Sequence, residues 1–267
     1  MAVRFLAVGD LMIDVVVAGR GHDAVARFGP GGTAANVAVW AASLGAEAFA
    51  AGAVGDDAGS RFLAAELGRS GVEAVFAVDP GERTGTFVLA DGEFRVDRGA
   101  NARLEPEALP DLPEADVVLV SGYLPERALA AVLACARGTW VTLEAANLDE
   151  LPVGGNAVIA NEQRARALTG EDAEEAARAL AVRYRLACVT CGARGAVAVL
   201  DGELARAEPP QRALQEVPGA GDAFSAGLLV ALAGGAGLAE ALAEGCRCGA
   251  QAAGSPGWPG SAESLGA

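Results

Sequence analysis

The sequence predicts an α/β fold: a three-layer α/β/α sandwich with a mostly parallel central sheet and a small β lid. Two observations predict it. Short apolar runs rich in β-branched residues alternate with Ala- and Leu-rich runs of helical spacing over almost the whole chain, which is typical of a parallel sheet covered by helices. Residues 83–98 break this alternation, because Asp91-Gly92 joins two strand-like runs and is a strong hairpin signal.

A single α/β domain is expected over residues 1–267, with lid strands near residues 14–28 and 84–100. The strands of the main sheet are short apolar runs between turn residues. They are expected at residues 3–8, 46–54, 116–121, 139–144, 156–160, 186–191 and 195–200.

Helices are expected where Ala, Leu and charged residues recur at helical spacing, and a glycine directly after such a run marks its end. Gly45 and Gly71 end the first two helices, and Gly170 interrupts a longer run. The expected ranges are 34–44, 57–70, 125–137, 161–185 with a break near Gly170, 222–233 and 238–253. Residues 254–267 are expected to form a loop or a frayed terminus.

The lid is expected from two strand-like segments that do not fit the alternation. They are the hairpin around Asp91-Gly92 and the run Asp14-Val15-Val16-Val17-Ala18. If they pair into a small sheet, that sheet can close over a substrate and exclude water from the reaction. An ordinary antiparallel edge of the main sheet is the alternative that the residues leave open.

The composition excludes several kinds of chemistry. A formal charge of −15 and a pI near 4.5 oppose binding to nucleic acid or to anionic membranes. The chain contains no lysine, which excludes a P-loop and a Schiff-base enzyme, and His22 is its single histidine, which excludes a multi-histidine zinc site. These properties favour a soluble enzyme that acts on a small molecule.

The cysteines and the hydropathy pattern predict a cytoplasmic protein. Five cysteines, an odd number, do not indicate a disulfide framework, and Cys188 and Cys191 are expected to be small core residues despite their C-x-x-C spacing. The most apolar late stretch, residues 224–232, is shorter than the roughly 20 residues that a membrane span requires.

Two glycine turns that lead into helices carry the candidate chemistry. The segment Pro218-Gly219-Ala220-Gly221-Asp222 places a carboxylate at a helix N-terminus, where unpaired N–H groups favour an anion. Such a carboxylate can take a proton from a hydroxyl group, or it can simply cap the helix. The earlier segment Gly31-Gly32-Thr33-Ala34-Ala35-Asn36 lets backbone approach a ligand and places an amide in the first helical turn.

In this order, the two turns resemble the paired signatures of the ribokinase-like (PfkB) family of carbohydrate and nucleoside kinases. Further segments are similar to motifs of that family over most of the chain. These segments are Gly9-Asp10 with Asp14, Gly55-Asp56-Asp57-Ala58-Gly59, Arg98-Gly99-Ala100-Asn101, Ser121-Gly122, Asn161-Glu162 and Thr190-Cys191-Gly192-Ala193-Arg194-Gly195.

The resemblance implies a role for each matching residue. Asp222 would be the general base, and Gly219, Ala220 and Gly221 would form the anion hole for the γ-phosphoryl group of ATP. The acceptor would be held by Asp14, Gly31, Gly32, Asn36 and, from the lid, Asn101. The ATP would be bordered by Asn161, Thr190, Gly192 and Gly195, and Mg²⁺ would accompany it.

Three positions depart from the family pattern. Glu216 and Val217 stand where the family often has Asp-Thr, which argues against activation by a monovalent cation. Arg164 stands where an N-x-x-E motif would place a glutamate near Mg²⁺ and phosphate. Glu162 or Glu144 is a candidate to hold the metal through water instead.

The leading hypothesis is an ATP-dependent kinase for a primary hydroxyl of a small sugar or sugar acid. A nucleoside kinase of the same fold and a non-catalytic sugar- or nucleotide-binding sensor stay open as alternatives. A dehydrogenase is disfavoured, because no complete G-x-G-x-x-G follows the first strand. The expected partner is a small sugar, with neither nucleic acid nor a membrane, and a homodimer through the lid is a further option.

Overall fold

The computed structural model describes residues 2–19, 21–210 and 218–254. A nine-stranded sheet has the order β13-β12-β11-β10-β9-β8-β1-β4-β5. The neighbouring strands from β5 to β11 pair in parallel, and the β11–β12 and β12–β13 pairings are antiparallel, so that β12 alone runs against the others. The bounds are β1 (Arg4–Val8), β4 (Glu47–Gly55), β5 (Val72–Asp79), β8 (Val117–Ser121), β9 (Trp140–Glu144), β10 (Ala157–Asn161), β11 (Leu186–Thr190), β12 (Ala196–Leu200) and β13 (Glu203–Ala207).

Helices cover both faces of this sheet, as the alternating pattern predicts. In β1, Phe5 and Ala7 pack into a core with helices α1 (Thr33–Ser43), α2 (Ala58–Arg69), α6 (Ala220–Ala233) and α7 (Leu238–Gly254). Leu6 and Val8 pack on the opposite face with α3 (Glu126–Cys135). The helices α4 (Glu162–Thr169) and α5 (Ala173–Ala181) cover a third buried cluster over β10–β12. The prediction of an α/β/α sandwich is confirmed.

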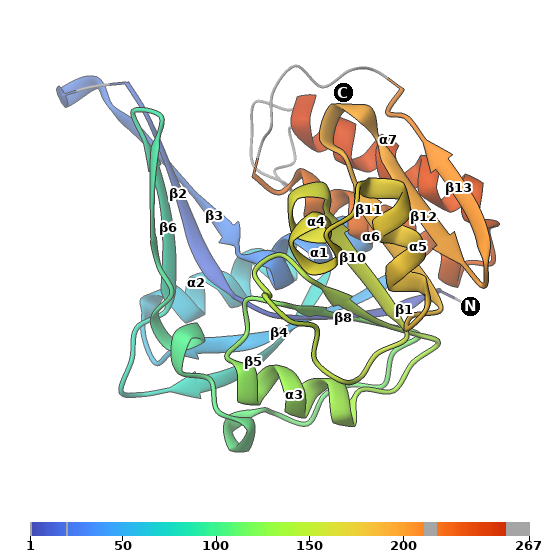
Figure 1. Cartoon of the computed structure of the whole chain (residues 1–267). Coiled ribbons are helices and arrows are strands. Elements are labelled where there is room, and N and C mark those ends of the chain that lie inside the picture. Colours follow the sequence, from blue (N-terminus) through green and yellow to red (C-terminus); the bar gives the residue numbers. More distant parts are fainter. Residues whose placement is uncertain (1, 20, 211–217, 255–267) are drawn as a thin grey trace.

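A separate four-stranded sheet of order β3-β2-β6-β7 projects from one side of the nine-stranded sheet (Figure 1). Its strands are β2 (Met12–Ala18), β3 (Val25–Gly31), β6 (Gly85–Ala90) and β7 (Glu93–Asp97). The Asp91-Gly92 turn has φ values of 54° and 80°, which are the left-handed values that a type I′ hairpin requires. The expected small β sheet therefore exists, and it is not an edge of the main sheet.

The sequence missed two strands of the main sheet. These are β5 and β13, whose residues mix exposed polar and buried apolar positions because both strands lie at the sheet edges. The run 161–185 divides into α4 and α5, with Gly170 in the left-handed conformation after α4. Of the segment 254–267, for which a loop or a frayed terminus is expected, Gly254 belongs to α7 and residues 255–267 lie outside the described residues. In the described part, no helix is long and apolar enough to cross a membrane.

Asp57 joins the helical layer to the base of the lid. It is the N-cap of α2, where its Oδ1 accepts the N–H of Ser60 at 3.0 Å. The same carboxylate accepts the N–H of Thr84 at 2.8 Å and the Thr84 hydroxyl at 2.7 Å. Thr84 directly precedes β6, so this one side chain fixes where the lid strand leaves the main body.

We expect Asp57→Ala to lower the free energy of unfolding by about 2–3 kcal/mol, because it removes a helix cap and leaves the Thr84 donors unpaired. Asp172→Ala is the matched control. Asp172 also caps a helix, but its described side-chain contact is only the N–H of Glu175 at 3.4 Å, so a loss of about 1 kcal/mol or less is expected. Urea unfolding measures the free energy of unfolding of both variants. Equal decreases in the two variants would contradict the role of Asp57 in holding Thr84.

Candidate active site

Three carboxyl groups from distant parts of the chain come together near the N-terminus of α6. They are Asp14 in β2, Glu144 at the end of β9 and Asp222 in the first turn of α6, and we call them the acidic cluster. Asp14 and Glu144 both experience the negative charge of Asp222. The fold thus joins the lid, the sheet and α6 at one point.

Asp222 is held by a side chain of the second glycine turn. Its Oδ2 accepts a hydrogen bond of 2.9 Å from Nδ2 of Asn36, which lies in the first turn of α1. The N-cap of α6 is Gly219, with φ 89°, and no side chain caps this helix. The alternative that Asp222 serves as a helix cap is therefore wrong, and its second carboxylate oxygen remains for other partners.

Burial raises the pKa of all three carboxyl groups. The pKa of Asp222 rises to about 7, although the hydrogen bond from Asn36 opposes the rise. Burial and the charge of Asp222 raise the pKa of Asp14 to about 7. The same two causes raise the pKa of Glu144 to about 8, against hydrogen bonds from the N–H groups of Ala146 and Gly122. Perturbed carboxyl groups in one cluster are typical of a functional site.

The Gly31-Gly32 turn has no room for side chains. A Cβ on Gly31 would lie 1.8 Å from Oδ1 of Asp14, so the carboxyl group of Asp14 rests directly against this glycine. A Cβ on Gly32, which has φ 83°, would lie 2.3 Å from the carbonyl oxygen of Asp10. Glycine is therefore required at both positions if Asp14 is to stay beside the start of α1.

The N-terminus of α6 exposes backbone next to Asp222. The first N–H groups of a helix have no partner within it, and the helix dipole makes this end attractive to anions. Gly221 is exposed, and nothing within 4 Å would meet a Cβ placed on it. Gly219, Ala220 and Gly221 can therefore present N–H groups to a bound anion beside a carboxylate.

The predicted nucleotide residues meet at the ends of β10 and β11. Asn161 and Thr190 are partners in the strand register, and Gly192 and Gly195 turn the chain directly afterwards with φ values of 56° and 86°. A Cβ on Gly195 would lie 1.9 Å from the carbonyl oxygen of Ala207. Asn161 also caps α4, because its Oδ1 accepts the N–H of Arg164 at 2.8 Å.

Asn101 lies differently from the sequence-based expectation of a sugar contact. Its side chain is buried, and its amide bonds to the backbone N–H and carbonyl of Leu11 at 3.0 and 2.9 Å and to the carbonyl of Arg98 at 3.0 Å. With these bonds made, Asn101 braces the connection between β1 and β2. These bonds hold the segment that leads to Asp14.

Sequence reasoning missed the pair formed by Asp10 and Arg98. Nε and Nη2 of Arg98 donate to the two carboxylate oxygens of Asp10 at 2.9 and 2.7 Å, and Nη2 also donates to the carbonyl of Tyr123 at 2.5 Å. The one sequence feature that indicated a role for Asp10 was its position directly after a buried strand, at the edge where the other site residues gather. Nothing in the sequence indicated that Arg98, 88 positions away, would pair with it.

The two candidate metal ligands, Glu162 and Glu144, differ in whether their carboxylate oxygens already have partners. Glu162 forms an ion pair with Arg194, which ties α4 to the glycine turn after β11. Oε2 of Glu144 is buried and without a partner in the described structure. Nη1 of Arg164 donates to the carbonyl of Leu148 and to Asp149. Among the described residues, no group of three or more His, Cys, Asp or Glu side chains could hold a metal ion by itself.

Glu216 and Val217, on which the expectation about a monovalent cation depends, lie outside the described residues.

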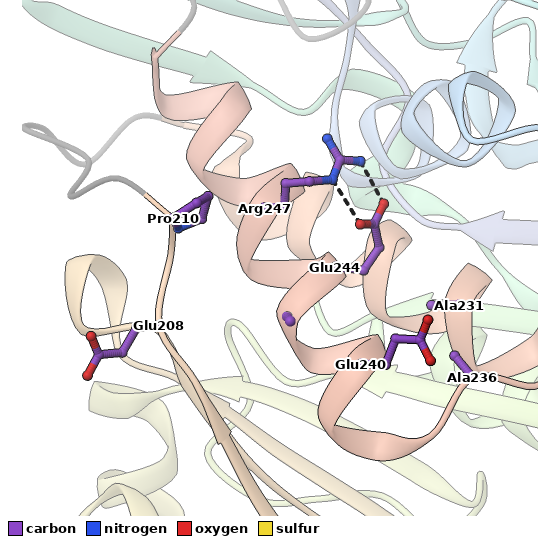
Figure 2. Close-up of a pocket in the computed structure, with 8 residues that line it drawn as sticks. Glu208, Pro210, Ala231, Ala236, Glu240, Glu244 and Arg247 are labelled. Carbon is purple, nitrogen blue, oxygen red and sulfur yellow. Dashed lines mark hydrogen bonds and ion pairs between the residues drawn. The ribbon is translucent and has the colours of Figure 1, made fainter.

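A pocket of about 460 Å³ lies away from the predicted site residues, beside α7 and the segment that follows β13 (Figure 2). An ion pair between Arg247 and Glu244 lies along it. Its lining contains none of the predicted site residues and consists of Glu208, Pro210, Ala231, Ala236, Glu240, Ala243, Glu244 and Arg247.

A three-layer α/β/α fold with a β lid and a carboxylate at an anion-binding helix end is typical of a kinase that phosphorylates a small molecule. The chain belongs to the pfkB family of carbohydrate kinases, whose family model matches residues 4–264. The predicted family is thereby confirmed.

Known relatives agree with this assignment. The chain is 34% identical to a 1-phosphofructokinase of Haloferax volcanii over 84% of its own length and 78% of the relative's. It is 30% identical to a fructokinase of Klebsiella pneumoniae, covering 93% and 92% of the two chains. The structure of Arabidopsis thaliana ribokinase complexed with ribose and ATP matches with a TM-score of 0.74 and 27% identity over 95% of this chain and 92% of that one.

Proposed function

We propose that this protein is an ATP-dependent kinase that transfers the γ-phosphoryl group to a primary hydroxyl of a small sugar or sugar acid. One observation carries the proposal. Asp222, held by Asn36 at 2.9 Å, lies in the first turn of α6, so a candidate base and an anion-binding backbone occupy the same place. Membership of the pfkB family supports the same reaction class.

Asp222 acts as the general base in this proposal. Its carboxylate takes the proton of the acceptor hydroxyl while the hydroxyl oxygen forms a bond to the γ-phosphorus, and the bond from that phosphorus to the β–γ bridging oxygen breaks to release ADP. The N–H groups of Gly219, Ala220 and Gly221 stabilise the negative charge on the phosphoryl oxygens. A pKa of about 7 suits a group that must accept a proton near neutral pH.

The acceptor is held by the residues that surround the Gly31-Gly32 turn. Asp14 accepts hydrogen bonds from its hydroxyl groups, and Gly31 and Gly32 let the acceptor approach the backbone. Asn36 contributes through Oδ1, which is buried and without a partner in the described part of the chain. Asn101 acts indirectly, because its bonds to the backbone of Leu11 hold the segment that leads to Asp14.

ATP and Mg²⁺ fit the donors that are present. Asn161, Thr190, Gly192 and Gly195 border the nucleotide, and the unpartnered Oε2 of Glu144 is suited to hold Mg²⁺ through water. Mg²⁺ commonly needs only one or two carboxylates besides substrate phosphates, so a cage of three protein ligands is not required. When bound, the ion neutralises charge on the phosphates. Glu162 is less suited, because Arg194 already pairs with it.

An assay of ADP release across a panel of sugars, sugar acids and nucleosides tests the function. ADP formed with a sugar or a sugar acid supports the proposal. ADP formed with nucleosides alone would assign a nucleoside kinase instead. Ligand binding by calorimetry without ADP formation under any cation condition would indicate a sensor, in which Arg164 in place of the expected glutamate would be the feature to examine.

The four-stranded sheet serves as the lid, and we propose that a second copy of the chain covers its outer part. Val25, Phe94 and Val96 are 58%, 66% and 48% exposed and lie on the same face as Asp14. Phe94 stacks on Phe87 at 5.7 Å. We expect Phe94→Ser to lower the dimer fraction in sedimentation experiments. A wild-type protein that stays monomeric at all concentrations would contradict this.

A further inference from the structure

The titratable side chains of the acidic cluster are all carboxyl groups, so any charge that the cluster carries is negative. The acidic cluster contributes Asp14, Glu144 and Asp222. The carboxylate of Asp10 is 4% exposed, and the Tyr123 side chain experiences its charge together with those of Glu144 and Asp222. The carbonyl of Asp10 accepts the N–H of Ala34 at 3.3 Å and lies against Gly32, which places Asp10 at the acceptor turn. Any acceptor that carries its own negative charge must therefore find a cation nearby.

The cation at this turn is Arg98, and it is already engaged. Both oxygens of Asp10 receive its N–H groups, at 2.7 and 2.9 Å, and the carbonyl of Tyr123 receives another at 2.5 Å. This bidentate pair is partly buried, so opening it would leave the Asp10 carboxylate without its partner in a low-dielectric place. Arg98 thus neutralises the protein rather than a ligand.

Two further arginines, Arg164 and Arg27, are less well placed. Arg164 bonds to the carbonyl of Leu148 at 2.9 Å and to Asp149 at 3.1 Å. Arg27 has no ion-pair partner among the described residues, and it shares the lid face of Asp14. In the strand register, however, Arg27 pairs with Val16, whereas Asp14 pairs with Gly29. It therefore lies farther out on the edge strand β3 than the carboxylate that would hold the acceptor.

We infer that the acceptor is an uncharged polyhydroxy compound, and that the Asp10–Arg98 pair excludes acceptors that carry a phosphate or a carboxylate. The inference rests on the proposed kinase function and narrows it. Ionised carboxylates are acceptors only, so they match hydroxyl donors and repel anions. The names of the relatives do not decide between a neutral and a phosphorylated acceptor, because one relative is a fructokinase and another a 1-phosphofructokinase.

The first test compares matched acceptors with the full-length protein, saturating MgATP and detection of ADP. Fructose and ribose are the neutral acceptors, fructose 1-phosphate and fructose 6-phosphate the phosphorylated ones, and 2-keto-3-deoxygluconate the carboxylated one. We expect kcat/KM for the best neutral acceptor to exceed that for every anionic one by on the order of 100-fold. A preference for an anionic acceptor overturns the inference alone, whereas no ADP from any acceptor overturns the kinase function with it.

The second test changes the pair itself. Asp10→Asn removes one negative charge and loosens Arg98, so the preference for neutral acceptors should shrink by about tenfold or more. An unchanged preference in a folded variant overturns the role of the pair. Thermal melting checks folding, because Asp10 is buried.

Arg27→Gln gives a test that does not depend on the buried pair, because Arg27 is exposed. We expect the ratio of neutral to anionic turnover to stay unchanged. The matched control is Arg95→Gln, since Arg95 pairs with Val88 on the opposite lid face. A loss of about tenfold that is confined to anionic acceptors and to Arg27→Gln would identify Arg27 as an anion-binding residue and would overturn the inference.

Discussion

Replacing Asp222 by Asn is expected to lower kcat by about 10²- to 10⁴-fold, the usual contribution of a positioned general base. Asn keeps the size of the side chain and can still accept a hydrogen bond from Nδ2 of Asn36, so the geometry that the 2.9 Å bond defines is retained. What disappears is the ability to take a proton. The KM for the acceptor should therefore change much less than kcat.

The control for this substitution is Asp172→Asn. Asp172 also lies at a helix N-terminus, but it is the N-cap of α5, and its side-chain hydrogen bond in the described structure is to the N–H of Glu175 and not to the acidic cluster. Asn caps a helix about as well as Asp, so neither activity nor stability should change measurably. If Asp222→Asn keeps the wild-type kcat, Asp222 is not the base, whatever else it binds.

The pH profile offers a second measurement on the same residue. The proposed reaction needs ionised Asp222, and burial raises the pKa of this carboxyl group to about 7. Activity should therefore rise with pH and reach half of its maximum near neutrality, far above the ordinary range of an aspartate. The kcat of Asp222→Asn, measured at saturating acceptor so that ionisation of Asp14 does not limit binding, should lose most of this dependence. A wild-type profile that stays flat from acidic to basic pH would contradict the assignment.

The parts of the molecule that local sequence encodes could be predicted. Asp91-Gly92 specified its hairpin, because few turns other than type I′ suit that pair. The glycine turns before α1 and α6 pointed to Asn36 and Asp222 from their own neighbourhoods, although the bond between these two residues spans 186 positions. The edge strands β5 and β13 carried a weaker signal, because one side of each strand lacks a partner strand.

The partners of charged and polar side chains could not be predicted. The fold pairs Glu162, a candidate metal ligand, with Arg194, and it engages the amide of Asn101, a candidate sugar ligand, with the backbone of Leu11. Such pairings depend on three-dimensional contacts between residues far apart in the chain. A single sequence shows which groups can bind, and only the fold shows which are already occupied.

Asp14 is the residue for which binding and stability should conflict most clearly. Its carboxyl group lies against Gly31, and burial together with the charge of Asp222 raises its pKa to about 7. A group whose pKa is raised in the folded state stabilises the fold at low pH, and that stabilisation is lost as the pH rises through the folded-state value. At neutral pH and above, the ionised carboxylate therefore destabilises the empty protein.

We expect Asp14→Asn to lower kcat/KM by about 10²- to 10³-fold, since hydrogen bonds to a charged group contribute roughly 1.5–3 kcal/mol each. The same variant should melt at a higher temperature than the wild type near about pH 8, and the difference should vanish near about pH 4, where the wild-type carboxyl group is protonated as well. Enzyme assays and thermal melts across this range measure both effects. A variant with wild-type kcat/KM would remove Asp14 from the acceptor site.

Gly31→Ala separates the two effects of Asp14. An added Cβ would lie 1.8 Å from Oδ1 of Asp14, so the carboxylate must move away although its charge remains. Activity should fall as it does in Asp14→Asn, but the melting temperature should fall too, because the charge stays buried and the turn is strained. Loss of activity in both Asp14→Asn and Gly31→Ala, with melting temperatures that shift in opposite directions, would show that the Asp14 carboxylate serves acceptor binding and lowers the stability of the fold.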